Sequence, residues 1–212
     1  MIKYTQLTAP AAEPITTAEV KAQLRLSTSA DDTLIGDTII PGVRDFAERH
    51  TMTAIPKRTF TAVYDNVTTR KASALGWWDG VQQGSVSETV IVRKLELPLP
   101  PLVSVEEVRT FDRNGDSTVF SSTGYYLDTY GEPGSLVLKD GYTWPLNLRD
   151  VNALEIDFTA GYEDIPPMLK IAMLQIAAHW YENRELYEVG TILARVPIGA
   201  MAILDRFKLR RL

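Results

Sequence analysis

The hydrophobic pattern is helical at both ends of the chain and alternating between them. The longest helical pattern covers residues 165–185, where Pro166 and Pro167 suit an opening turn whose N–H groups have no helical partner. Apolar residues recur there at spacings of three and four: Leu169, Met173, Ile176, Ala177 and Trp180. This pattern predicts a long amphipathic helix whose wide apolar stripe needs a partner surface.

Two shorter helices are predicted near the N-terminus. Thr16, followed three residues later by Glu19, forms a capping box, so the first helix starts there and ends near residue 26. Asp31 or Asp32 can cap a second helix that runs to His50. We therefore expect a helical region over residues 16–50.

The second helix has its own core-facing stripe, formed by Leu34, Ile35, Ile39, Val43, Phe46 and Ala47. Gly36 and the Pro41-Gly42 pair interrupt this pattern, because proline removes an interior helical hydrogen bond. We expect one bent helix whose stripe packs against the helix over residues 165–185.

From residue 58 to residue 162 the period changes to two, which is typical of strands. The predicted strands cover residues 58–65, 88–97, 104–112, 117–121, 125–130, 135–140 and 153–162. The connections are short and rich in turn residues, so the pairing should be antiparallel. Residues 66–87 are left as a long polar loop with Trp77 and Trp78 near its middle.

The predicted fold class is therefore α+β. Two N-terminal helices and one long C-terminal helix form a small antiparallel helical core, and the β-rich region is inserted between them. We expect one domain over residues 1–185, with helices at 16–50 and 165–185, the insertion at 58–162 and the extended loop at 66–87. Residues 186–212, which Gly190, Pro197 and Gly199 interrupt, are expected to form a C-terminal tail.

Composition and charge narrow the classes of protein. The 212 residues are 45% hydrophobic and 23% charged, which is ordinary for a globular protein. There is no cysteine, no signal-peptide pattern and no apolar run long enough to span a bilayer, so synthesis in the cytoplasm without membrane association is expected. The net charge of −5 disfavours a general nucleic-acid binder. Residues 186–212, with five basic and two acidic residues, carry +3, so the rest of the chain carries −8.

Candidate chemical motifs are weak. Asp112 to Asp116 imitates the start of a calcium loop, but the glycine and glutamate that such a loop needs are absent, which favours a hairpin turn at Asn114-Gly115. His179 and Glu182 share a helix face without other ligands nearby in the sequence, which favours a helix-end hydrogen bond. No nucleophile, phosphate-binding or zinc motif occurs. We expect no enzyme activity, no cofactor, no metal and no catalytic residue.

Two groups of residues are candidates for binding a protein partner. Trp77 and Trp78 are either core residues or anchors that the loop carries to another subunit. The tail adds Tyr187, Arg195, Arg206, Phe207, Lys208, Arg210 and Arg211, whose basic residues are either solvated, docked on an acidic partner or facing DNA phosphates. A protein partner is favoured, because no nucleic-acid-binding module accompanies them.

Several local sequences resemble the head-tail connector family of tailed phages, also called adaptor or head-completion proteins. They are Leu7 to Pro10 with Pro14 to Thr16, Glu19 to Arg25, Leu97 to Val105, Ala160 to Tyr162 with Ile165-Pro166, and His179 to Glu185. These segments are spread over most of the chain, so together they are more specific than any one of them. The loop over residues 66–87 departs from the shorter family pattern.

The resemblance implies a structural protein of the virion neck that assembles in the bacterial host cytoplasm. Such proteins form a ring, commonly of twelve subunits, beneath the portal protein. The ring extends the channel through which genomic DNA passes without sequence-specific binding, and it is a platform for the next neck or tail protein. The family offers no catalytic residues.

Two other functions stay open at this level. A tail-terminator or other neck ring protein has similar needs, but it should be a β-sandwich with fewer helices. A carbohydrate-binding or hydrolytic module would stack Trp77 or Trp78 on sugar rings and would place paired carboxylates beside them.

Overall fold

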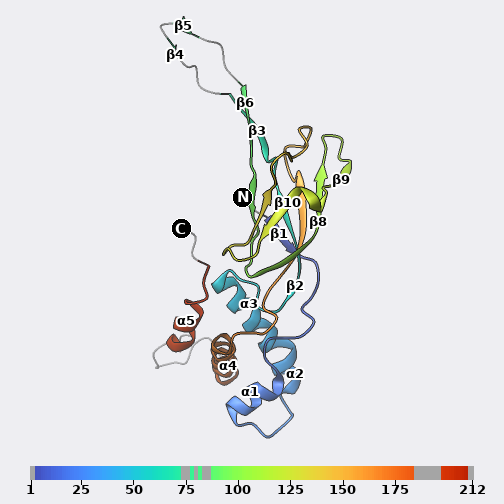
Figure 1. The fold of residues 1–212 in the computed structure, drawn as a ribbon. Helices are drawn as coiled ribbons and strands as arrows, with labels where there is room; N and C mark the ends of the chain where they lie inside the picture. Colours follow the sequence, from blue (N-terminus) through green and yellow to red (C-terminus); the bar gives the residue numbers. More distant parts are fainter. Residues whose placement is uncertain (1–2, 73–76, 79–80, 83–86, 184–196, 210–212) are drawn as a thin grey trace. The chain divides into compact units, whose positions relative to one another are not determined.

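The computed structural model describes residues 3–72, 77–78, 81–82, 87–183 and 197–209, with only backbone described between residues 68 and 91. The chain divides into two compact units (Figure 1). The sheet unit contains Met1–Leu7, Thr59–Pro98 and Leu102–Thr159, and the helical unit contains Thr8–Arg58, Leu99–Pro101 and Ala160–Leu212. The predicted α+β class is confirmed: along the sequence, helical segments precede and follow an antiparallel β region.

The helical unit contains the segments that the apolar stripes predict. Their bounds are α1 (Thr17–Leu24), α2 (Asp32–Leu34), the π-helical turn η1 (Ile35–Ile39), α3 (Ile40–Thr51), α4 (Pro167–Glu182) and α5 (Ile198–Leu204). The predicted capping box is present at α1, where the Thr16 hydroxyl accepts from the Glu19 N–H at 3.3 Å and the Glu19 carboxylate accepts from the Thr16 N–H at 2.9 Å. α4 begins and ends within a few residues of its predicted bounds.

The predicted irregularity of the second helix is confirmed as the π-helical turn. α2, η1 and α3 follow one another without a break, with Gly36 inside η1 and Pro41 in the first turn of α3. A Cβ atom on Gly42 would lie 3.3 Å from the Trp180 ring, which shows how closely α3 approaches α4. Glycine at this position therefore serves helix packing.

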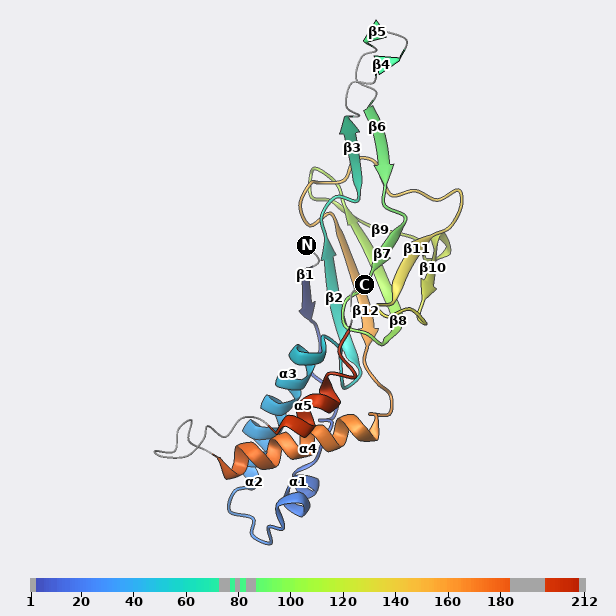
Figure 2. The same cartoon turned by 90° about the vertical axis from the view of Figure 1, so that its left-hand side faces the viewer.

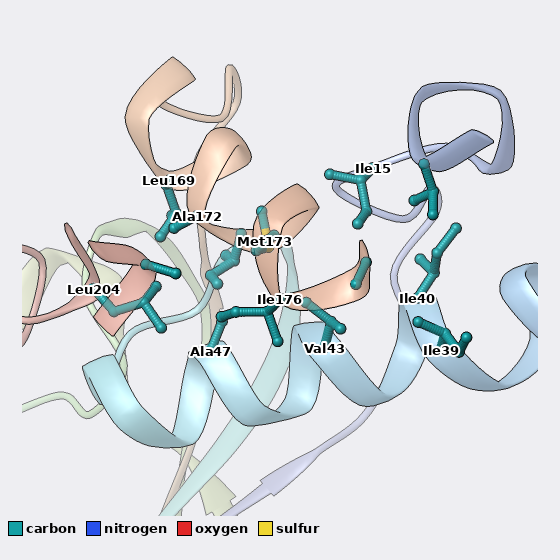
Figure 3. Close-up of a cluster of buried hydrophobic side chains, with 14 of the residues drawn as sticks. Ile15, Ile39, Ile40, Val43, Ala47, Leu169, Ala172, Met173, Ile176 and Leu204 are labelled. Atoms are coloured by element: carbon teal, nitrogen blue, oxygen red, sulfur yellow. The ribbon is translucent and has the colours of Figure 1, made fainter. Parts of the chain in front are cut away.

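The core of the helical unit forms where the stripes of α3, α4 and α5 meet (Figure 3). Its buried side chains include Ile39, Ile40, Val43, Ala47, Leu169, Ala172, Met173, Ile176 and Leu204. Ile15, just before α1, joins them. The predicted packing of the second helix against the long C-terminal helix is thus confirmed, and α5 adds a further layer that the sequence pattern did not require.

A buried ion pair fixes the chain that leaves α3. The Glu48 carboxylate accepts from both terminal nitrogens of Arg58 at 2.7 Å, and it also accepts from the Ile55 N–H at 2.9 Å. Both side chains are almost fully buried. A bidentate pair with an additional backbone donor satisfies the carboxylate, which offsets the cost of its desolvation.

The sheet unit contains antiparallel strands that are mostly those predicted. Their bounds are β1 (Lys3–Gln6), β2 (Arg58–Tyr64), β3 (Thr68–Ala72), β4 (Trp77–Trp78), β5 (Val81–Gln82), β6 (Ser87–Ile91), β7 (Lys94–Glu96), β8 (Leu102–Phe111), β9 (Ser117–Val119), β10 (Tyr125–Asp128), β11 (Ser135–Leu138) and β12 (Leu154–Ala160), with a short 3-10 helix, η2 (Ser122–Gly124), before β10. They form a five-stranded sheet in the order β1-β2-β12-β8-β9, a three-stranded sheet β10-β11-β7, and the pairs β3-β6 and β4-β5. Figure 2 shows the sheets from a second direction.

The core of the sheet unit follows the strict alternation of β12. Leu154, Ile156, Phe158 and Ala160 are fully buried, while the intervening residues are half-exposed. Phe158 stacks on Phe60 of β2 at a centroid distance of 5.7 Å. The Tyr64 hydroxyl of β2 donates to the Glu96 carbonyl of β7, which joins the two larger sheets.

Two local expectations for the β region were wrong, and one strand was not predicted. The strand without a prediction is β1, which pairs with β2 although all four of its residues are exposed. The predicted strand over residues 88–97 is divided into β6 and β7. The predicted loop over residues 66–87 contains β3, which pairs with β6, and the β4-β5 pair. In β1 backbone pairing, rather than an apolar face, holds the strand, so hydrophobic periodicity gives no signal.

Stability of the helical unit should depend on the side of α4 that a residue occupies. Ile176→Ala removes a fully buried side chain and should lower the free energy of unfolding by about 2–5 kcal/mol. Ile171→Ala on the same helix is the matched control, because Ile171 is 45% exposed and its truncation should cost less than about 1 kcal/mol. Urea unfolding followed by circular dichroism measures both values. Equal losses would contradict the assigned core face.

Candidate partner-binding surfaces

The described part of the predicted tail is anchored to the helical unit. Residues 197–209 form α5 and the turn after it, with Ala200 and Leu204 fully buried. Asp205 accepts from the His50 ring at 2.7 Å, and the Leu209 N–H donates to the Thr51 carbonyl at 2.8 Å. Residues 197–209, which the sequence predicts as part of a tail, therefore pack on the core. The apolar side of α5 is hard to recognise in the sequence, because loop-forming residues surround it.

The tail candidates divide between described and undescribed residues. Arg206 and Lys208 are exposed, whereas Phe207 is half-buried and packs against the apolar core of the helical unit. Tyr187, Arg195, Arg210 and Arg211 lie outside the described residues. The two exposed basic residues are thus presented from an anchored segment, and the role of the whole group stays a prediction.

Trp77 and Trp78 form β4. They pair with Gln82 and Val81 of β5, so this part of the predicted loop has strand geometry. Their side chains lie outside the description. Whether they are core residues or anchors for a partner therefore stays open.

The calcium-like motif is a turn, as predicted. One oxygen of the Asp112 carboxylate accepts from the backbone N–H groups of Asn114 at 2.8 Å and Asp116 at 2.9 Å. Gly115 has a φ of +92°, which glycine adopts without strain. The Asp112 carboxylate is thus engaged in holding the turn between β8 and β9.

The predicted helix-end role of His179 is also confirmed. The Asn183 side chain lies 3.1 Å from the His179 Nδ1 atom and donates to the His179 carbonyl at 2.9 Å. This closes the last turn of α4 without involving Glu182. Within the described parts of the chain, no group of three or more His, Asp or Glu side chains could hold a metal ion.

Perturbed pKa values occur at structural contacts. The Lys170 ammonium and the Thr16 N–H hold the pKa of Glu19 below its ordinary value, which stabilises the start of α1 against α4. Burial raises the pKa of Tyr64, whose hydroxyl donates to a backbone carbonyl. Burial, and then the charge of Glu106, raise the pKa of Tyr125. These pKa shifts therefore arise from burial, from hydrogen bonds and from neighbouring charges within the fold.

The polar face of β12 carries a cross-strand ion network that sequence reasoning missed. Arg109 of β8 binds Asp157 at 2.7 Å and lies 3.7 Å from Glu155. The Thr61 hydroxyl of β2 donates to the same Asp157 carboxylate at 2.6 Å. The alternation of β12 already places Glu155 and Asp157 on one face, but only the strand order brings Arg109 beside them.

An exposed aromatic and apolar group around β10 was missed as well. Tyr126 is 63% exposed, Leu127 is 36% exposed, and Tyr130 in the following turn is 98% exposed. The Lys139 ammonium lies 4.7 Å from the centre of the Tyr126 ring, and the Asp128 carboxylate accepts from the N–H groups of Tyr130 and Gly131. The turn is therefore ordered while it exposes its aromatic residue. The strand is too short for its alternation to reveal this.

Comparisons with known proteins agree with the resemblance in the sequence. Residues 147–208 match the family model described as phage gp6-like head-tail connector protein. This range contains β12 of the sheet unit and the helices α4 and α5 of the helical unit. The predicted resemblance to head-tail connector proteins is thereby confirmed.

Solved structures with the same fold come from gene transfer agent (GTA) particles. A chain from the neck of an empty GTA particle with C6 symmetry is 23% identical, with a TM-score of 0.68 over 99% of this chain and 97% of that chain. A chain from the virion of a native GTA particle is 22% identical, with a TM-score of 0.68 over 99% and 96%. A chain from the neck of a native GTA particle with C12 symmetry is 21% identical, with a TM-score of 0.61 over 99% and 97%. At these identities the likeness establishes the fold.

No characterised protein matches the sequence closely enough to count as a relative. Among the helices that the structure describes, none is both long and apolar enough to cross a bilayer.

The anchoring of residues 197–209 can be tested by substitution. Leu204→Ala removes a fully buried contact of α5 and should expose the amides of Asp205 and Leu209, which bond to backbone carbonyls in the folded state. Hydrogen exchange followed by mass spectrometry should show a roughly tenfold or greater loss of protection there. Ile198→Ala is the control, because Ile198 is 82% exposed on the same helix. Unchanged protection in Leu204→Ala would mean that α5 is held by other contacts.

Proposed function

We propose that this protein is a structural head-tail connector of a phage-like particle. It assembles as a ring beneath the portal protein, extends the DNA channel and offers a platform for the next neck or tail protein. The observation that carries this proposal is the shared architecture. The fold is similar over 99% of this chain and 97% of the two GTA neck chains. The family match over residues 147–208 supports the same role independently.

A ring is supported by the symmetry of the similar assemblies. The similar neck structures were computed with C6 and with C12 symmetry, and a ring of twelve copies, which is compatible with both, is the arrangement we propose. Ring subunits use two different surfaces, one for each neighbour, and these surfaces become buried only on assembly. The localisation that follows is the neck of the particle, after assembly in the bacterial cytoplasm.

The portal and the next neck protein are the partners proposed for the two candidate groups of residues. The basic group around Arg206 and Lys208 suits an acidic surface of the portal, because it contrasts with the charge of −8 on the rest of the chain. Trp77 and Trp78 suit an apolar pocket on a protein partner. No catalytic step is part of this proposal.

Charge also suits passage of DNA through the ring. The protein carries a net charge of −5, and residues outside the tail carry −8. A wall of like charge does not release counterions from DNA, so it avoids the attraction that would retain the molecule. This supports a channel that DNA crosses without sequence-specific binding.

The other functions have less support. A tail-terminator or other neck ring protein should be mainly a β-sandwich, whereas half of this chain forms a helical unit. A carbohydrate-binding or hydrolytic module needs carboxylates beside the tryptophans, and nothing in the described residues favours it.

Electron microscopy and native mass spectrometry of the purified chain, with and without the portal protein of the same particle, test the assembly. The expected result is a ring, either alone or on the portal. A free monomer is compatible with the proposal if the ring forms when portal is added. A monomer in both conditions, or binding to glycans, would reject it.

Charge reversal tests the basic group separately. Replacing Arg206, Lys208, Arg210 and Arg211 by Glu should weaken portal binding by about tenfold or more, because opposite charges that steer docking become repulsive. Circular dichroism and the unfolding midpoint should stay unchanged, since Arg206 and Lys208 are exposed. Arg25→Glu with Arg49→Glu gives a control for a change of charge elsewhere in the helical unit. Unaltered portal binding, measured by biolayer interferometry, would remove this group from the interface.

A further inference from the structure

Strand β10 leaves one edge of the three-stranded sheet open. The Lys139 N–H donates to the Gly124 carbonyl at 3.0 Å, and Tyr125 lies opposite Leu138. In an antiparallel pair the hydrogen-bonded residues alternate. Tyr126 and Asp128 therefore pair with β11, while Tyr125 and Leu127 direct their N–H and C=O groups away from it. No other strand in the described residues pairs with β10.

β10 is a short edge strand, and three of the devices that protect edges in other proteins are missing from it. β10 has the sequence Tyr-Tyr-Leu-Asp, with no proline and no lysine, and it continues its pairing with β11 without a bulge. Tyr126 and Leu127 on this strand and Tyr130 just after it are exposed. An unprotected, partly apolar edge is a template for an added strand.

The two-stranded ribbon β3-β6 also has an open backbone edge, which lies on β3. The Val92 N–H donates to the Val67 carbonyl at 3.0 Å, and Thr68 lies opposite Ile91. By the same alternation, Thr68, Arg70 and Ala72 direct their backbone groups to the open edge of β3. Among the described elements, β3 and β6 pair only with each other. A two-stranded ribbon is marginally stable by itself in water, so it gains most from a further strand.

Charge indicates which edges fit together. β10 contains Asp128 and no basic residue, and Glu132 lies in the turn after it, while the Lys139 ammonium is engaged over the Tyr126 ring at 4.7 Å. β3 contains Arg70 and Lys71 and no acidic residue, whereas β6 contains Glu88. Opposite charges favour β3 over β6 as the strand beside β10.

We propose that β3 of one copy adds to the open edge of β10 in the next copy. The result is a continuous sheet β6-β3-β10-β11-β7 shared by two subunits. Because the two edges belong to different surfaces of the chain, the contact is heterologous and can repeat around a closed ring. This inference rests on the proposed ring and assigns one of its lateral contacts.

Proline at position 127 tests the strand addition while sparing the pairing with β11. Leu127→Pro removes an N–H that points to the open edge, whereas the N–H groups of Tyr126 and Asp128 remain. Leu127→Ala is the matched control, because it truncates the same side chain and keeps the N–H. The proline variant should need about tenfold more protein to form rings, on the portal or alone, because each lost hydrogen bond weakens every contact in the ring.

Cysteine cross-linking identifies the neighbouring strand directly. The chain contains no cysteine, so Tyr126→Cys mixed with Thr69→Cys, Arg70→Cys or Lys71→Cys introduces only the intended pair. At least one mixture should give a disulfide-linked dimer within assembled rings, because paired strands bring opposite Cβ atoms to about 4.5–5.5 Å. Tyr126→Cys mixed with Val119→Cys, on the exposed strand β9, should give none.

The outcomes separate this inference from the proposed function. Absence of any ring for the unaltered protein, alone and with portal, rejects both. Rings that form equally well with Leu127→Pro and Leu127→Ala, without cross-links from Tyr126→Cys to β3, reject only the strand addition. Cross-linking of Tyr126→Cys to the portal, found by mass spectrometry, also rejects it, because the occupant of the edge would then be a different protein.

Discussion

Burial of the apolar face of α4 is the interaction on which the helical unit depends. Leu169, Ala172, Met173, Ile176 and Ala177 are fully buried. Each large aliphatic side chain contributes on the order of 1.5–3 kcal/mol when it leaves water. α3 covers one part of this face and α5 (Ile198–Leu204), which follows α4 (Pro167–Glu182) only after an intervening segment, covers another and completes the core. The arrangement also decides which basic side chains remain outside, because α5 is anchored by Leu204 and by the contact between His50 and Asp205.

The sheet unit is stabilised by apolar packing together with ion pairs and backbone hydrogen bonds. β12 buries one face completely and uses the other for ion pairs and hydroxyl contacts, so apolar packing and polar pairing alternate along one strand. β1 contributes little buried surface and is held mainly by its backbone hydrogen bonds to β2. Strands that are held mainly by backbone hydrogen bonds, as β1 is, can separate from a sheet or accept a new partner strand more easily than buried strands. They lose little apolar contact if they separate, and they expose backbone groups that another strand can use.

Under the proposed ring assembly, unpaired backbone groups have a functional meaning. A subunit of a ring must remain folded before assembly and must still have surfaces that gain free energy afterwards. Within the described residues, each unit has its own buried side chains, while β10 and β3 each pair with one strand only. Backbone pairing suits such a contact because it demands a defined register without a large exposed apolar patch, which would promote aggregation.

The class of the fold, the capping of α1, the irregular second helix, the long helix α4 and most strands can be predicted from the sequence. These features follow from local periodicity and from residues such as Thr16, Pro167 and Gly115, whose preferences act over a few positions. It also indicated the connector resemblance. The three-dimensional arrangement was needed to see that β1 pairs with β2, that α5 completes the helical core and that Arg109 binds Asp157. It also shows that, among the described strands, β10 pairs only with β11. These features depend on which distant segments become neighbours. Contacts between distant segments produce no periodic pattern of hydrophobic and polar residues, so the sequence does not reveal them.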